Sequence, residues 1–539
     1  MKKIETLFAG ISLFAVIVTI SGAIWRFAYP AQTTLHTQEY QATRFGAFLA
    51  SQHAIHVNDF DKAAEFAADF EDTELPIVLN TAILADFLSG KMLSKAELLR
   101  DEKGMAARLI YDAYLLEKGD WKGIYERHKK DESALTAPLR IWSSVAMGKS
   151  AEALKFIDAL KTKNSWKAFI RGQIYAENNQ FDKAAKEFAK VSVDFMNIND
   201  YLYIISFYKN HEKVDAANKL RSDFTERPGS MYMLNVKTSA DWENYSGLNN
   251  SLAFSLIQSV SHTQIMMYSD FSLLLLRLAE TSHWGKSGDT NALNYYLGQY
   301  FYNNGGDYKK HFLAIDPNSP FFSFAMMKIA EKTGDIDELR TAAEANPLFV
   351  PAMNKLVARY VQQGDKKRAL NVADRALKND NLTETGRAFL LKTRAYINLT
   401  FNNLDAAQTD IRAAADVLPL DAGILAIQSK IWSYERRELE TAYEYAIALV
   451  RRNPTEIESW DALGMAVWAR EGADAALEVV ERVGQVSESC SVLFEHLGDL
   501  HAELGNKKLA KDAYLRAIDL SADGLTIIPK LENKIKNLK

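Results

Sequence analysis

Two histidine pairs are the side chains whose spacing could support metal chemistry. His53 and His56 are three residues apart and would share one face of a helix, whereas His496 and His501 flank another helical segment. A zinc site needs three or four ligands at fixed spacing, and neither pair has a third. We therefore interpret all four as structural histidines and predict no metal site.

The sequence also gives little support for nucleotide binding or for catalysis by a nucleophilic side chain. Gly285-Lys286-Ser287 resembles the end of a phosphate-binding loop, but Glu280 stands where that loop requires its first glycine. No HExxH, GxSxG or GxGxxG segment is present. The single cysteine, Cys490, excludes an intramolecular disulfide, and we expect it to be a small buried residue near a helix start. The sequence thus predicts no catalytic residue, no cofactor and no enzyme.

Composition narrows the class of partner. The chain has 539 residues, too many for one compact core, so several domains or a repeat array are expected. Its 64 basic and 69 acidic residues are interspersed and give a net charge of −5. Because no basic stripe could neutralise phosphates, nucleic acid is not an expected partner.

The N-terminus carries an apolar run. Lys2 and Lys3 precede the uncharged segment Leu7–Trp25, which is just long enough to cross a hydrocarbon core of roughly 30 Å. It is either an uncleaved anchor, which we favour because Trp25 suits a membrane interface, or a signal peptide cleaved near Ser21-Gly22-Ala23. Both predict that the body is exported: in a bacterium it would lie in the periplasm, anchored to the inner membrane or released. Arg26 weakens the charge asymmetry and leaves the opposite topology open.

The helical segments that carry these residues recur along the chain at a fixed spacing. Leu463-Gly464 recurs 34 residues later as Leu497-Gly498, and alanines 442, 476 and 510 keep the same spacing. The distance of 12 residues from Gly464 to Ala476 is found again from Gly172 to Ala184. Small residues at these positions let two short helices cross closely, since a larger side chain would push their axes apart.

This pattern resembles the tetratricopeptide repeat (TPR). The best matches are Trp460, Leu463, Gly464 and Ala476 in one repeat and Phe494, Leu497, Gly498, Ala510, Tyr514 and Ala517 in the next. The resemblance implies an all-α, right-handed solenoid of helix hairpins. The apolar run at 7–25 adds one N-terminal transmembrane or signal helix to this expected fold. The ending also resembles a family of exported alphaproteobacterial TPR proteins, through Asp461–Met465 and His496–Asp499, although Met465 departs from that family's Trp. That likeness implies no defined activity.

We predict four regions: an anchor or signal peptide at 1–30, a degenerate TPR-like solenoid at 38–194, an irregular helical middle at 195–320 and a C-terminal TPR solenoid at 321–539. The middle is either a seam between two solenoid halves or a set of divergent repeats. A helix is expected over Leu252–Leu278, with the apolar run Leu273–Leu276 deeply buried.

TPR first helices line a concave groove that can hold a peptide or a partner helix. The repeat offsets assign the following candidate partner-binding residues to that groove: Glu458, Asp461, Met465, Trp468, Glu495, Asp499, Tyr396 and Tyr434. The acidic pair of final repeats favours a basic or neutral ligand.

The leading hypothesis is a non-enzymatic interaction scaffold or adaptor of the cell envelope, with a protein or peptide in the groove and the membrane as its second partner. One alternative is an envelope enzyme, such as a peptidoglycan-processing one, with a catalytic module in 195–320. Another is a membrane-anchored regulator of envelope biogenesis, for which a zinc module would need more than one cysteine.

Overall fold

The computed structural model describes residues 43–538 apart from 70–74, 92–94, 103, 227–241, 243–244, 263–269, 285–289, 380–381 and 487–489. Its regular elements are all helical within that part, as the TPR pattern predicts. The expected anchor or signal segment at 1–30 lies outside the described residues. None of the helices in the described ranges is both long and apolar enough to cross a membrane.

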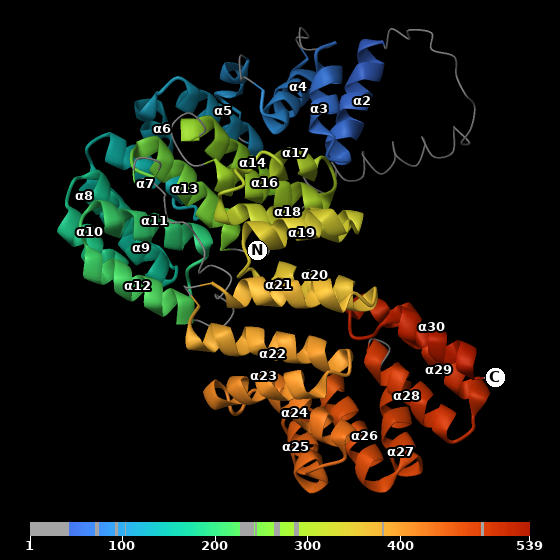
Figure 1. Ribbon diagram of the computed structural model, residues 1–539. Helices are drawn as coiled ribbons and strands as arrows, with labels where there is room; N and C mark the ends of the chain where they lie inside the picture. Colours follow the sequence, from blue (N-terminus) through green and yellow to red (C-terminus); the bar gives the residue numbers. More distant parts are fainter. Residues whose placement is uncertain are drawn as a thin grey trace, which may run out of the picture.

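Helices follow one another in antiparallel pairs along most of the chain (Figure 1). The first part contains α2 (Arg44–His56), α3 (Phe60–Ala67), α4 (Pro76–Ser89), η1 (Ala96–Leu99), α5 (Met105–Glu117), α6 (Trp121–His128), α7 (Ala137–Ala146), α8 (Ser150–Ala159), α9 (Asn164–Glu177), α10 (Phe181–Phe188), α11 (Ile198–Asn210) and α12 (Val214–Glu226). It continues through α13 (Leu248–Ser261), α14 (Asp270–Ala279), η5 (Glu280–Trp284), α16 (Asn291–Asn304), α17 (Tyr308–Phe312), α18 (Pro320–Thr333) and α19 (Ile336–Ala345).

The C-terminal part is a regular series of hairpins. It consists of α20 (Val350–Gln362), α21 (Lys366–Leu377), α22 (Glu384–Thr400), α23 (Leu404–Val417), α24 (Ala422–Glu435), α25 (Leu439–Arg452), α26 (Ile457–Glu471), α27 (Ala473–Val486), α28 (Ser491–Glu503), α29 (Lys507–Leu520), η6 (Ser521–Asp523) and α30 (Ile528–Asn537).

Short turns set the hairpins. A residue in the left-handed region ends the first helix, as at Asn58 (φ 60°) and Gly364 (φ 76°), and an aspartate then caps the second helix. Asp59 accepts a hydrogen bond from the backbone N–H of Lys62, and Asp365 does the same for Arg368. These caps satisfy backbone donors that have no partner inside the helix.

The predicted close crossings are confirmed. A Cβ added to Gly172 would lie 2.4 Å from Phe188 of the paired helix, and one added to Gly498 would lie 2.4 Å from Tyr514. Both aromatic rings therefore fill the space that a side chain at the glycine would need. Gly298 and Phe312 repeat the arrangement in α16 and α17, at 2.3 Å, where the strict sequence period is lost.

Helices of the middle segment lie inside the N-terminal part. α13 and α14 run within the curve formed by α4 to α11 (Figure 1), and α13 packs against α7 and α9 while α14 packs against α4 and α5. Leu273–Leu276 are buried, as predicted. The expected continuous helix over Leu252–Leu278 is wrong, however, because α13 ends at Ser261 and His262 turns to pair with Asp200, 2.6 Å away.

The C-terminal hairpins close on themselves. Helices α20 to α30 follow a curved path, and its last elements return to its first (Figure 1). Gln362 Nε2 donates to Ser521 Oγ at 3.0 Å, and α20 packs against η6. Gly524 approaches so closely that a Cβ there would lie 2.1 Å from Ala358 Cβ. The last hairpin is thus held by residues about 160 positions earlier.

Candidate partner-binding face of the C-terminal helices

The predicted groove residues lie on first helices of consecutive hairpins, and Asp461 of α26 is their most enclosed member. Its side chain is fully buried. Oδ2 lies 2.5 Å from Lys430 Nζ on α24, and Oδ1 lies 2.6 Å from His496 Nδ1 on α28. Burial alone would raise the pKa of Asp461, but His496 and Lys430 outweigh burial and hold that pKa well below its usual range.

His496 extends this contact to Tyr434. Its Nε2 lies 3.0 Å from the hydroxyl of Tyr434, which is one turn beyond Lys430 on α24. Because the Asp461 carboxylate can only accept, His496 Nδ1–H donates to it, and with a neutral ring the Tyr434 O–H donates to Nε2. Three successive first helices are therefore joined by one polar network, buried at Asp461 and reaching the surface at Tyr434.

A second network joins α28 to the terminal helix α30. Lys530 and Lys534 lie 2.9 Å and 2.8 Å from Glu495 Oε1, and Lys534 also lies 2.7 Å from Asp499. Glu495 is buried, which by itself would raise its pKa, yet the two lysines lower the pKa of that carboxyl to about 2. Both carboxylates are consequently neutralised by the chain's own cations.

The remaining predicted residues differ in accessibility. Tyr434 (42% exposed) and Glu458 face solvent, and Tyr396 on α22 is half-buried. Trp468 is also half-buried and donates from Nε1 to Glu503, 3.1 Å away. Met465 is buried (5% exposed) and presents little surface to a ligand.

The structure thus brings together Asp461 with Tyr434, and Glu495 with Asp499, but not Met465 or Trp468 with either pair.

Sequence reasoning missed the cations of these networks. Lys430, Lys530 and Lys534 escaped attention because the repeat offsets select positions on a helix face and not the charges opposite them. A signal was present: Asp461 to His496, Glu495 to Lys530 and Asp499 to Lys534 are each separated by 35 residues, about one repeat. The acidic character on which the basic-ligand prediction depended is therefore largely balanced within the chain.

The other residues with possible chemistry have structural surroundings. Cys490 is buried (3% exposed) at the N-cap of α28, as expected, and burial raises the pKa of its thiol to about 12. His501 lies 3.5 Å from Glu481, so the predicted pair His496 and His501 faces two different carboxylates. No group of three metal-ligating side chains occurs among the described residues.

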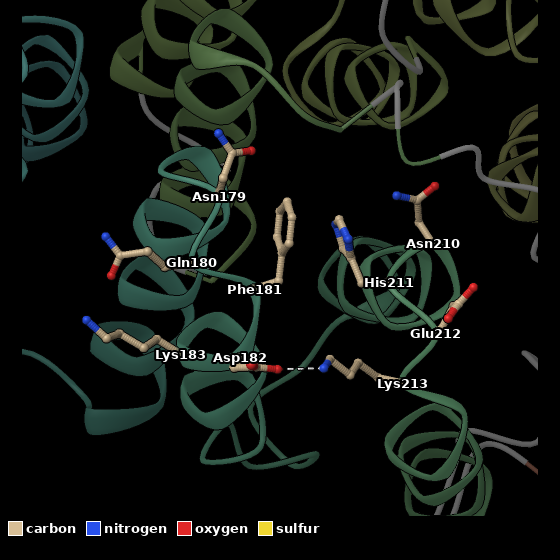
Figure 2. Close-up of a pocket in the computed structure, with 9 residues that line it drawn as sticks. All are labelled: Asn179, Gln180, Phe181, Asp182, Lys183, Asn210, His211, Glu212 and Lys213. Atoms are coloured by element: carbon tan, nitrogen blue, oxygen red, sulfur yellow. Dashed lines mark hydrogen bonds and ion pairs between the residues drawn. The ribbon is translucent and has the colours of Figure 1, made fainter.

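A separate surface depression lies between two hairpin turns of the N-terminal part (Figure 2). It encloses about 550 Å³ between the turns at 179–183 and 210–213. Phe181 and His211 stack at its centre with ring centroids 3.8 Å apart, and Lys213 pairs with Asp182 at 2.6 Å along one side. Lys213 and Asp182 neutralise each other, and His211 Nε2 is buried without a hydrogen-bond partner. One such atom is not a set of converging groups for a ligand.

Comparison with known proteins identifies the class. Residues 493–523, which cover most of α28 and all of α29, match the family model described as a tetratricopeptide repeat. This segment is therefore a tetratricopeptide repeat, as the Leu497-Gly498 motif predicts. No curated protein sequence matches the chain. The likeness to exported alphaproteobacterial proteins stays a prediction.

Solved structures overlay on most of its length. A chain of the APC/C hetero-tetramer Cut9–Hcn1 gives a TM-score of 0.32 at 14% identity and covers 91% of this chain and 96% of that chain. A chain of yeast Tom70 gives 0.26 at 12% identity and covers 91% and 95%. Overlays this loose indicate nothing about the arrangement of the whole chain.

Proposed function

We propose that this protein is a non-enzymatic interaction scaffold of the cell envelope that binds a partner protein on the inner face of its C-terminal hairpins. The observation that carries the proposal is the pair of ionic networks, one buried and one partly exposed, that connect α24, α26, α28 and α30. A surface held in this way is preorganised, so little side-chain and backbone freedom is lost when a partner binds.

The contact surface follows from accessibility. Tyr434 and Glu458 are exposed, and Tyr396, Trp468 and Asp499 are half-buried, so these five can touch a partner directly. Aromatic side chains of this kind supply much of the binding energy in protein interfaces. Asp461, Met465 and Glu495 would act indirectly, by fixing the helices that carry the five contact residues.

The two ionic networks change the kind of partner segment that this face would prefer, because they neutralise most of its carboxylates. Glu458 is exposed next to the buried Lys430, and its carboxylate lacks an ion-pair partner among the described residues. Lys534 neutralises Asp499. We infer a largely neutral partner segment with apolar groups for Tyr434 and Trp468 and one cation for Glu458.

Location in the envelope is supported by the sequence of the N-terminal segment. Lys2 and Lys3 before the apolar run Leu7–Trp25 favour an anchored protein whose body is exported. A topology reporter fused after Lys539 tests this. We expect activity from a reporter that works only outside the cytoplasm, and activity from a cytoplasmic reporter alone would contradict export.

The binding face is tested with a photo-crosslinking amino acid in full-length protein. At Glu458 it should capture a discrete partner in cells, whereas at Glu478, an exposed residue of the second helix α27, it should not. Tyr434→Ala should reduce capture at Glu458 without altering the circular dichroism of the protein. Equal capture of the partner at positions 458 and 478 would contradict the assignment of the binding face.

Among the described residues of 195–320, no observation favours the alternative of a catalytic module. α13 and α14, the central helices of that segment, are packed inside the N-terminal part and contribute core residues such as Leu256 and Leu275. Most of their side chains fill the fold, although Arg277 of α14 lines a pocket of about 450 Å³ together with Asp307 and His311.

A further inference from the structure

The N-terminal edge of the solenoid exposes large apolar side chains. Phe45 is 69% exposed and Leu49 43% exposed, one turn apart on α2. Leu75 and Ile77, at the start of α4, are 63% and 66% exposed. Single exposed apolar residues are ordinary, but four of them on the first hairpin and the helix that follows it call for a covering surface.

The position of α2 explains this exposure. Its opposite face, with Ala47, Ser51 and Ala54, packs against α3 and α4. Among the described residues no helix precedes α2, and none of them covers the side that carries Phe45 and Leu49. Because α2 and α4 are first helices of consecutive hairpins, they run in the same direction and their first turns lie at the same edge.

The chain that precedes α2 indicates what lies against this edge. The apolar run Leu7–Trp25 has the length of a membrane span, and Thr43 caps α2. The 12 residues from 31 to 42 can extend over about 40 Å at most. An anchor at 7–25 would therefore hold Phe45 and Leu49 permanently close to the lipid headgroups, at a high effective concentration.

We propose that the edge formed by α2 and the first turn of α4 docks on the lipid surface, with Phe45, Leu49, Leu75 and Ile77 inserted at the headgroup boundary. Phe, Leu and Ile are suited to that boundary, where apolar side chains leave water while the backbone keeps polar partners. The proposal rests on the anchored form of the proposed function. It adds an orientation: the edge at α2 faces the membrane, and the C-terminal hairpins, at the opposite end of the molecule in Figure 1, face away from it.

The test uses full-length protein in which Cys490 is replaced by alanine and one new cysteine carries an environment-sensitive fluorophore. Leu49→Cys places the label on the edge and keeps Phe45, Leu75 and Ile77. Leu420→Cys is the matched control, because Leu420 is also an exposed leucine (72%) but precedes α24 in the C-terminal part. Both proteins are reconstituted into phosphatidylcholine vesicles with and without lipids that carry a nitroxide quencher near the headgroup.

Flotation of the vesicles is measured first, then quenching. We expect the protein to float with the vesicles and the quencher lipid to dim the label at position 49 severalfold more than the label at 420. Flotation with equal quenching at both positions would overturn the docking alone and leave the anchored scaffold intact. A blue shift at 49 without quenching would overturn it too, since residues 1–42 or a second copy would then cover the edge. Failure to float would overturn the anchor and the docking together.

Discussion

At the scale of single residues, Asp461 illustrates how a fully buried carboxylate depends on its partners, Lys430 and His496. Asp461→Ala would leave Lys430, whose side chain is only 13% exposed, without its counter-charge. Removing one partner of such a pair destabilises by about 3–5 kcal/mol. Hydrogen exchange of peptides from α24, α26 and α28 measures the local unfolding free energy.

Two variants control this prediction. Asp461→Ala combined with Lys430→Met should recover much of the lost stability, because no uncompensated charge then stays buried. The side chain of Asp182, which pairs with Lys213, is 85% exposed. Asp182→Ala should therefore change stability by less than about 1 kcal/mol. If Asp461→Ala were as mild as Asp182→Ala, the network would not hold the helices together.

His311 gives the protein a predictable dependence on pH. It is buried (7% exposed) and stacks on Phe301, and burial, helped by Arg277 and Lys310, lowers the pKa of its imidazole to about 4. Below pH 6.5 the unfolded chain binds a proton that the folded protein does not bind, so stability falls as the pH drops toward 4. Between pH 7 and pH 5 this effect amounts to about 2 kcal/mol.

His311→Phe should remove that part of the dependence, because phenylalanine keeps the stacked ring and cannot titrate. Urea unfolding of the wild type and the variant at pH 7 and pH 5 gives the comparison. The variant should lose about 2 kcal/mol less between the two pH values, whereas His56→Gln, on the exposed side of α2, should behave like the wild type. Parallel pH curves for all three proteins would show that His311 is not the titrating group.

At the scale of helices, Gly498 fixes how closely α28 and α29 cross. A Cβ at this position would lie 2.4 Å from Tyr514, which is itself buried, so Gly498→Ala should destabilise by about 1–3 kcal/mol through overpacking. Gly484→Ala in α27 is the matched control. Its Cβ would meet Leu497 at an ordinary 3.8 Å, and alanine should stabilise the helix by up to about 1 kcal/mol. Thermal unfolding of both variants should therefore shift in opposite directions.

The hairpins were predictable from the sequence for the same steric reason. Gly172, Gly464 and Gly498 are recognisable because close helix crossing tolerates few residue types, so spacing alone reports the packing. Gly298 shows the limit: it crosses Phe312 in the same way, but its neighbours break the period, and the sequence indicated only an irregular region. Packing constrains one position per helix strongly and leaves the remaining positions variable.

The candidate site was less predictable than the hairpins. The offsets selected Asp461 and Tyr434 on first helices, and in the structure both contact His496, but an offset says nothing about which charge lies opposite. Whether a carboxylate faces solvent or a buried lysine depends on residues one repeat away. Lys430 and Lys534 therefore decide the character of this face, and only the packed structure shows them in place.

At the scale of the whole molecule, both parts of the chain close through contacts between distant hairpins. In the N-terminal part the α2–α3 turn meets α16, where Asn58 Nδ2 donates to the carbonyl oxygen of Asn304 at 2.8 Å. In the C-terminal part η6 and Gly524 meet α20. Repeat arrays are usually stabilised only between neighbours, so such closures couple the ends and should make each part unfold more cooperatively.

Closure of the C-terminal part can be tested at Gly524. It has φ +74° and leaves no room for a side chain against Ala358, so Gly524→Val should separate α30 from α20 while the individual hairpins stay folded. Spin labels at Gln363 and Glu532, both exposed, report the distance between the two ends. In the wild type we expect one narrow distance distribution, and in Gly524→Val a broader and longer one.

Gly505→Val is the control for this prediction. It introduces comparable backbone strain (φ +80°) in a turn with open space around it, and it should leave the distance unchanged. A narrow, unshifted distribution in Gly524→Val would mean that the ion pairs of Lys530 and Lys534 with α28 hold the closure without the contact to α20.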